Sequence, residues 1–329
     1  MPSQANSQPL FDLFSFARRG PGRRAHLSPG EIHQVARTVR RTPEVMVKVL
    51  PKSANTLTAV RKHLAYIGRR GELDLETDDG ERLRGTRVGK DLVEDWDLEL
   101  DDYRRKSDLS ATRGRESARL VHKIIFSMPA STPPEKVLTA VKNFAREEFA
   151  LKHRYVMALH TDTPSPHVHL VIKAVSEQGQ RLHIRKAALR EWRSGFAHHL
   201  RALGVAASAT PRYVRGEISV RKSDGIYRAG LRGESTFLSK QAETIQQELK
   251  GGKLLVESGK TDLIETRNEI RRAWLAVEGI LIRDRQPELA AQVRQFVGRM
   301  PPVETEKEGL ARKLLRQAKE KRALEGPVR

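Results

Sequence analysis

The sequence predicts an α+β protein, in which a central, mostly antiparallel sheet is flanked by helices and followed by a helical C-terminal region. Short apolar runs that are typical of buried strands alternate with segments whose apolar residues recur at helical spacing. Several of these runs are joined by short turns rich in Pro, Gly or Asp, as in hairpins between antiparallel strands. Beyond residue 216 the sequence becomes polar and mostly helical.

The first expected elements are a strand over residues 45–50 and a helix over residues 55–68. The helix is predicted by apolar residues at helical spacing, which are Leu57, Val60, Leu64 and Ile67. Gly68 marks its end. Tyr66 stands one position off the apolar stripe, so its hydroxyl can face a cleft rather than the core.

The chain is predicted to divide into three parts. Residues 1–43 are rich in Arg, Gly, Pro and Ser and are expected to form a flexible basic leader. Residues 44–216 form one α+β domain, whose later elements are strands over 120–128, 155–160 and 167–172 and helices over 133–149 and 186–203. Residues 217–329 form an accessory or export region, with helices over 236–250, 262–282, 288–298 and 304–324.

An acidic segment interrupts the first domain. From Glu72 to Asp102 there are 13 acidic residues against four basic ones. Its first part, around Asp78-Asp79-Gly80, is typical of a hairpin with an Asp-Gly turn, and the rest predicts an amphipathic helical insert. A solvated acidic face is the interpretation we favour over mimicry of DNA or closure over a basic cleft.

The composition points to a nucleic-acid partner. The chain of 329 residues carries 61 Lys and Arg against 41 Asp and Glu, a net charge of +20, and such a surface attracts a polyanion. No apolar stretch approaches the roughly 20 residues that span a bilayer, so we expect no membrane partner. The chain has no cysteine, which excludes thiolate metal sites and fits a cytoplasmic protein.

Residues 160–169 are the most informative stretch, because they hold three of the chain's 11 histidines. His160 ends one predicted strand, and His167 and His169 open the next. Alternate residues of a strand share a face, and the Thr-Pro-Ser-Pro turn lets the two strands lie side by side. The three imidazoles therefore converge in a predicted metal site with open coordination positions, as in catalytic centres.

Asp162 stands two residues after His160. We expect its carboxylate to accept the free N–H of a ligand imidazole, since metal-bound histidines need such a partner to fix their tautomer. Imidazole ligands suit zinc, manganese, nickel or cobalt better than magnesium, which prefers oxygen.

Three motifs resemble those of the conjugative relaxases, in particular the MobA-like and T-DNA border endonuclease-type relaxases, which are HUH-type single-strand nickases. Residues 160–169 follow the pattern H-x-D-x-x-x-P-H-x-H before an apolar strand. Residues 66–71, Tyr-Ile-Gly-Arg-Arg-Gly, resemble the tyrosine motif, and residues 124–130 resemble a strand that ends in Ser-x-Pro-Ala. The resemblance covers roughly residues 44–216.

The resemblance implies an HUH-type nuclease that nicks DNA at an origin of transfer. Tyr66 would attack the phosphodiester, leave a 5′-phosphotyrosine and permit religation. Ser127 would position the DNA, and Arg69 and Arg70 would bind it. The metal, a nearby cation such as Arg69 or Arg70, or a local base must help deprotonate the phenol. The resemblance also implies a divalent metal, magnesium or manganese, as cofactor. The implied partners are single-stranded origin DNA, relaxosome accessory proteins and a type IV secretion coupling protein, with possible export on the DNA.

Three alternatives stay open on the sequence. A rolling-circle replication initiator would use the same metal and tyrosine, but it usually places the tyrosine after the histidines, whereas Tyr66 precedes them. A zinc hydrolase, in which water attacks, would need a general base near the metal and leaves the charge of +20 unexplained. A non-catalytic basic DNA-binding protein, whose histidines only join two strands, would have no reason to keep Tyr66.

Overall fold

The computed structural model describes residue 13 and residues 26–50, 55–111, 119–217, 224–252 and 255–325. Contacts divide the chain into two compact units. Residues 41–209 belong to the first unit, and residues 26–40 and 210–325 belong to the second. Each unit has a hydrophobic core of its own.

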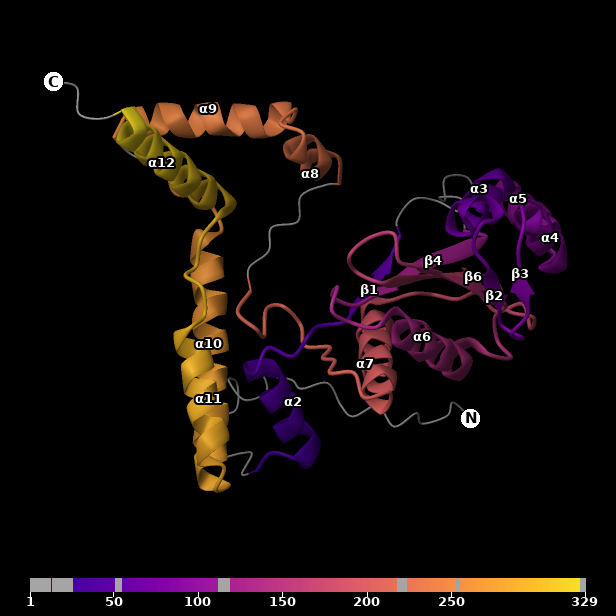
Figure 1. Ribbon diagram of the computed structural model, residues 1–329, viewed down its shortest axis with the longest axis horizontal. Coiled ribbons are helices and arrows are strands. Elements are labelled where there is room, and N and C mark those ends of the chain that lie inside the picture. The colour runs from indigo at the N-terminus through magenta and orange to yellow at the C-terminus, as the bar shows by residue number, and fades with distance from the viewer. Residues whose placement is uncertain are drawn as a thin grey trace. The chain divides into compact units, whose positions relative to one another are not determined.

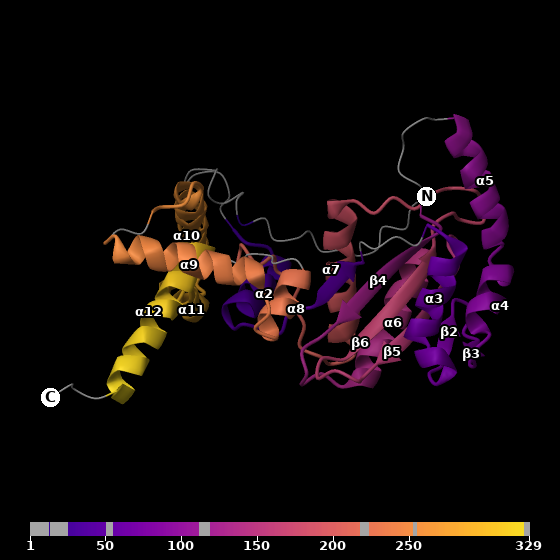
Figure 2. The same ribbon diagram turned by 90° about the horizontal axis from the view of Figure 1, so that it is seen from above.

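In the described part of the chain, the first unit is built on a six-stranded sheet whose neighbouring strands are all antiparallel. In chain order the strands are β1 (Met46–Val49), β2 (Leu75–Thr77), β3 (Arg82–Leu83), β4 (Val121–Ser127), β5 (Tyr155–His160) and β6 (His167–Lys173). Across the sheet the order is β1-β4-β6-β5-β2-β3, and Figure 2 shows β4, β6 and β5 side by side. The predicted α+β class is confirmed.

Helices cover both faces of this sheet (Figure 1). One face carries α6 (Pro134–Phe149) and α7 (Lys186–Ala202), and the other carries α3 (Leu57–Ile67), α4 (Val88–Asp95) and α5 (Leu98–Ala111). β6 shows how the alternation of a strand serves both layers. Leu170 and Ile172 belong to the core beneath α6 and α7, whereas Val171 packs beneath α3 and α4. His167 and His169 share the face of Val171.

The acidic segment forms the predicted β2–β3 hairpin, α4 and the first residues of α5. The interpretation of a solvated acidic face is incomplete, because several carboxylates pair with basic residues of the same unit. Arg154 donates to Asp78 and Asp95 with N–O distances of 2.9 and 3.0 Å. These ion pairs join the hairpin and α4 to the start of β5, so the segment is part of the domain.

The second unit is helical among the described residues. It contains α2 (Pro29–Val39), α8 (Asp224–Leu231), α9 (Thr236–Lys250), α10 (Lys260–Arg283), α11 (Pro287–Gly298) and α12 (Glu306–Glu325). The core between α2, α10 and α11 centres on Trp274, whose ring is fully buried and whose indole N–H donates to the Val214 carbonyl at 2.8 Å. In the described residues, no helix is long and apolar enough to cross a bilayer.

The prediction of a flexible leader over residues 1–43 is wrong for Pro29–Val39. Ser28 and Glu31 cap each other's backbone N–H groups, and Pro29 occupies the first helical position, which together stabilise a helix start. Val35 of this helix is fully buried in the second unit. Residues 1–12 and 14–25 lie outside the described residues.

Candidate active site

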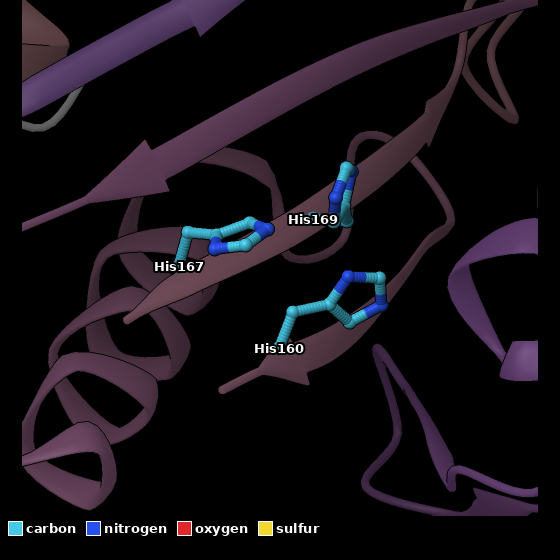
Figure 3. A group of neighbouring side chains, drawn as sticks. All are labelled: His160, His167 and His169. Carbon is cyan, nitrogen blue, oxygen red and sulfur yellow. The ribbon is translucent and has the colours of Figure 1, made fainter. Parts of the chain in front are cut away.

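Three histidines meet where β5 ends and β6 begins (Figure 3). The register pairs His160 with His167, and His169 follows on the same face. The ring centroids are 4.5 Å apart for His160–His169, 5.2 Å for His167–His169 and 5.3 Å for His160–His167. One ring nitrogen from each residue lies within 4.8 Å of the others, so a single ion can reach all three.

Two backbone carbonyls fix the tautomers of this triad. His160 Nε2 lies 2.7 Å from the Ile67 carbonyl, and His167 Nδ1 lies 3.1 Å from the Ser165 carbonyl. A carbonyl oxygen only accepts, so each of these nitrogens carries the proton. His160 Nδ1 and His167 Nε2 therefore keep their lone pairs for a ligand.

His169 provides the clearest indication of a metal. Its side chain is buried, and neither ring nitrogen has a hydrogen-bond partner among the described residues. Burial, followed by the nearby His160 and His167, lowers its pKa to about 3, so the imidazole is neutral at neutral pH. A buried polar nitrogen without a partner is costly, whereas a neutral imidazole is a good metal ligand. The residues present fit a divalent ion.

Arg69 lies between the triad and Asp162. Its Nη2 atom donates to His160 Nδ1 at 3.1 Å and also pairs with the Asp162 carboxylate. The prediction that Asp162 accepts the N–H of a ligand imidazole is therefore wrong: the backbone carbonyls take that role, and Asp162 holds Arg69 instead. Asp162 lies in the exposed turn beyond β5, where Arg69, a residue 93 positions earlier in the chain, reaches it.

A tight reversal after α3 puts Arg69 in this position. Arg69, Arg70 and Gly71 all have left-handed backbones, with φ of 49°, 57° and 98°, a conformation that costs free energy for side chains other than glycine. A Cβ atom on Gly71 would lie 2.5 Å from the carbonyl carbon of Gly85. Only glycine fits there, so the turn requires Gly71.

Tyr66 stands at the mouth of the site. Its side chain is 53% exposed, and its ring centroid lies 5.9 Å from that of His169 and 6.2 Å from that of His160. The Arg69 guanidinium carbon is 5.1 Å from the same centroid. Tyr155, by contrast, is buried in the core beneath α6. Within the first unit the structure brings Tyr66 to the triad, as the sequence predicted.

His63 was not predicted to belong to this site, yet its ring lies 6.1 Å from both Tyr66 and His169. Its Nε2 atom is buried without a hydrogen-bond partner in the described structure. Burial and the charge of Lys123 lower its pKa to about 4. The signal in the sequence was its position three residues before Tyr66, which places both side chains on one face of α3.

The other two predicted residues lie at the rim. Ser127 pairs in register with His167, but its side chain is buried and its hydroxyl donates to the Pro166 carbonyl at 3.2 Å. It thus ties β4 to the proline turn that orients the histidines. Arg70 is exposed beside Arg69. Contact of Ser127 or Arg70 with DNA stays a prediction.

Comparison with known proteins agrees with this geometry. Residues 66–202 match the relaxase family described as MobA/VirD2-like, nuclease domain. The T-DNA border endonuclease VirD2 of Rhizobium radiobacter is 27% identical over 139 residues, which cover 39% of this chain and 31% of that relative. No solved structure matches the chain.

The matched segment begins at Tyr66 and includes the whole triad, so the family assignment and the site rest on the same residues. Less than a third of the curated relative is covered, and the likeness therefore concerns the nuclease domain alone. The resemblance predicted from the three motifs is confirmed: over residues 66–202 this chain is similar to the MobA/VirD2-like nuclease domain of relaxases.

Proposed function

We propose that this protein is a conjugative relaxase that nicks one DNA strand at an origin of transfer. The observation that supports this most is the juxtaposition of an exposed tyrosine with three converging imidazoles, one of which has no hydrogen-bond partner among the described residues. A nucleophile beside a Lewis-acid site is what phosphodiester cleavage requires.

In the proposed reaction the Tyr66 oxygen attacks phosphorus. A bond forms between that oxygen and phosphorus, the bond from phosphorus to the 3′ oxygen breaks, and the phenol's proton ends on the 3′-hydroxyl. The product is a 5′-phosphotyrosine, and the same steps in reverse religate the strand. A divalent ion bound by His160, His167 and His169 supplies Lewis-acid stabilisation of the charge on the phosphate.

Arg69 is proposed to support the attack by Tyr66. Its guanidinium lies over the phenol ring, where its positive charge stabilises the negative charge that develops on the attacking oxygen and on the phosphate. Its pairing with Asp162 fixes that orientation. Asp162 is therefore proposed as a residue that positions Arg69.

Manganese is the cofactor we propose first, with magnesium as the alternative. The candidate ligands are three imidazole nitrogens, and no carboxylate of the described residues belongs to the group. Magnesium prefers oxygen ligands, whereas manganese accepts nitrogen more readily. We propose single-stranded origin DNA as the substrate, and relaxosome accessory proteins and a type IV secretion coupling protein as partners.

Nicking of a supercoiled plasmid that carries the DNA flanking the gene tests the proposal. EDTA should abolish conversion to the open circle, and manganese should restore it. The His167→Ala variant should stay inactive with manganese, whereas His198→Ala, a change on the exposed side of α7, should nick like the wild type. Full nicking by metal-free protein would overturn the metal-dependent mechanism.

A further inference from the structure

A second basic pocket lies on the opposite face of the sheet from the triad. Its volume is about 260 Å³. The lining residues come from the ends of β1 and β4 and from the segment that leads into α7, and they are Val49, Arg119, His122, Arg181, Leu182, His183, Ile184 and Leu189. His122 is five residues from Ser127 along β4, which separates the pocket from the triad end of that strand by about 17 Å.

A buried histidine, His122, lines this pocket. The side chain is only 8% exposed, its Nε2 atom donates to the Leu182 carbonyl at 3.1 Å, and its Nδ1 atom has no partner among the described residues. Because Nε2 carries the proton, Nδ1 is a lone-pair acceptor. Burial, with the charges of Arg119 and Arg181, lowers its pKa to about 4. The lining of the pocket therefore includes a buried, neutral imidazole beside two cations.

The two guanidiniums have no anionic partner in the pocket, since none of the lining residues is acidic. Arg181 is held in place by its hydrogen bond to the Arg119 carbonyl at 2.8 Å. Asp101 lies outside the lining; its carboxylate interacts electrostatically with Arg181 and lies 4.0 Å from Lys173. Like charges that converge in a hollow without a counter-charge favour an anion, and guanidiniums match phosphate geometry best.

The opposite wall of the pocket is apolar. Val49, Ile184 and Leu189 belong to it and also pack on the core beneath α6 and α7. An anion alone would gain nothing from such a wall, whereas a nucleotide presents a charged phosphate on one side and an apolar base or sugar on the other.

We propose that this pocket is a second DNA-binding site, which takes one nucleotide unit of the strand outside the nick, with its phosphate between Arg119 and Arg181. This inference rests on the proposed relaxase function, which supplies the DNA strand. A free mononucleotide has the same chemistry, and the experiment distinguishes the two.

Binding of the full chain to a mixed-sequence single-stranded oligonucleotide, followed by fluorescence anisotropy, gives the first test. Arg119→Gln and Arg181→Gln should each weaken binding about tenfold, as expected for one charge-assisted contact, and reduce the salt slope by about one. The matched control is Arg146→Gln on α6, which removes the same charge from an exposed site. Equal affinities for the Arg119 and Arg146 variants would overturn the proposal.

Crosslinking tests whether the DNA strand lies at this pocket. Because the chain has no cysteine, a single introduced cysteine can be labelled specifically. His183→Cys, labelled with a photoreactive maleimide, should crosslink to the oligonucleotide, and adding Arg119→Gln should suppress the crosslink. Arg146→Cys with the same label should give little product. Equal crosslinking at both positions would overturn the proposal.

Competition with deoxyadenosine monophosphate shows whether the pocket binds a nucleotide unit of a DNA strand or a free mononucleotide. The mononucleotide concentration that releases the oligonucleotide should be far above the Kd of the oligonucleotide. Saturable binding of the mononucleotide that is lost in Arg119→Gln, with unchanged oligonucleotide binding, would overturn the assignment to DNA. These experiments measure binding and not cleavage, so failure here is distinguishable from failure of the nuclease proposal.

Discussion

Arg69 links the parts of the active site at the scale of single residues. The nitrogen of His160 that keeps its lone pair is the one to which Arg69 donates at 3.1 Å. This hydrogen bond and a metal–nitrogen bond at the same atom exclude each other. Asp162 competes for the same guanidinium, so it both draws Arg69 away from His160 and offsets a positive charge near the ion.

Asp162→Asn should therefore weaken manganese binding about tenfold, since a charge-assisted partner of Arg69 is lost and the cation next to the ion is no longer neutralised. Calorimetric titration of the full chain with manganese measures this change. Asp91→Asn, on the exposed side of α4, is the control and should bind like the wild type. Combining Asp162→Asn with Arg69→Gln should restore most of the affinity. Wild-type affinity in the single variant would contradict the role given to Asp162.

At the scale of elements, periodicity was enough to predict most of the structure. The strands of residues 155–160 and 167–172, which carry the triad, and the helix of residues 55–68, which carries Tyr66, were expected from alternation and helical spacing. The interval of two residues between His167 and His169 guarantees a shared face in any strand.

What the sequence did not reveal depends on contacts between distant segments. Asp162 pairs with Arg69, 93 positions earlier, and no local rule predicts that choice. His63 belongs to the site only because α3 packs beside β6. The helix Pro29–Val39 had a readable local signal, the Ser28–Glu31 capping box, which the basic and Pro-rich composition of its surroundings obscured.

The free energy of unfolding should depend measurably on pH through His122, which lies on β4. Its folded pKa of about 4 is below the unfolded value of about 6.5. The unfolded chain therefore binds more protons between these values, and stability falls as the pH drops through this window. Lowering the pH from about 7 to about 5 should cost about 2 kcal/mol through this residue.

Urea unfolding of the wild type and of His122→Phe at the two pH values measures this effect. The variant loses the contact with Leu182, so its stability at neutral pH will differ, but the pH-dependent part should shrink by about 2 kcal/mol. The other buried histidines are the same in both chains and cancel in the comparison. Equal pH dependence in the two proteins would contradict a neutral, buried His122.

At the scale of the whole molecule, the candidate active site belongs to one of the two compact units of the chain. Every predicted site residue lies within residues 41–209, and so does the candidate second DNA site. The sequence placed the end of the domain at residue 216, but Val214 and Gly216 make hydrogen bonds to Trp274 and Arg267 of the second unit. Those contacts could not be read from local patterns.

A shortened chain of residues 41–209 should therefore fold and cleave single-stranded origin DNA, with loss of transfer in a mating assay. A chain of residues 41–216 should behave alike, since the additional residues belong to the other unit. Circular dichroism and gel filtration establish folding before cleavage is scored. A folded, monodisperse 41–209 chain without cleavage activity would show that the second unit contributes to the nuclease reaction.

The central claim is that Tyr66 becomes covalently attached to the 5′ end of the nicked strand. The most direct measurement incubates the full chain with manganese and a 3′-labelled origin oligonucleotide and resolves the products on a denaturing gel. Wild-type protein and Tyr103→Phe, a change at an exposed tyrosine of α5, should give a slow, denaturant-resistant adduct. Tyr66→Phe should give none while still binding the oligonucleotide. An adduct that survives in Tyr66→Phe would contradict the account.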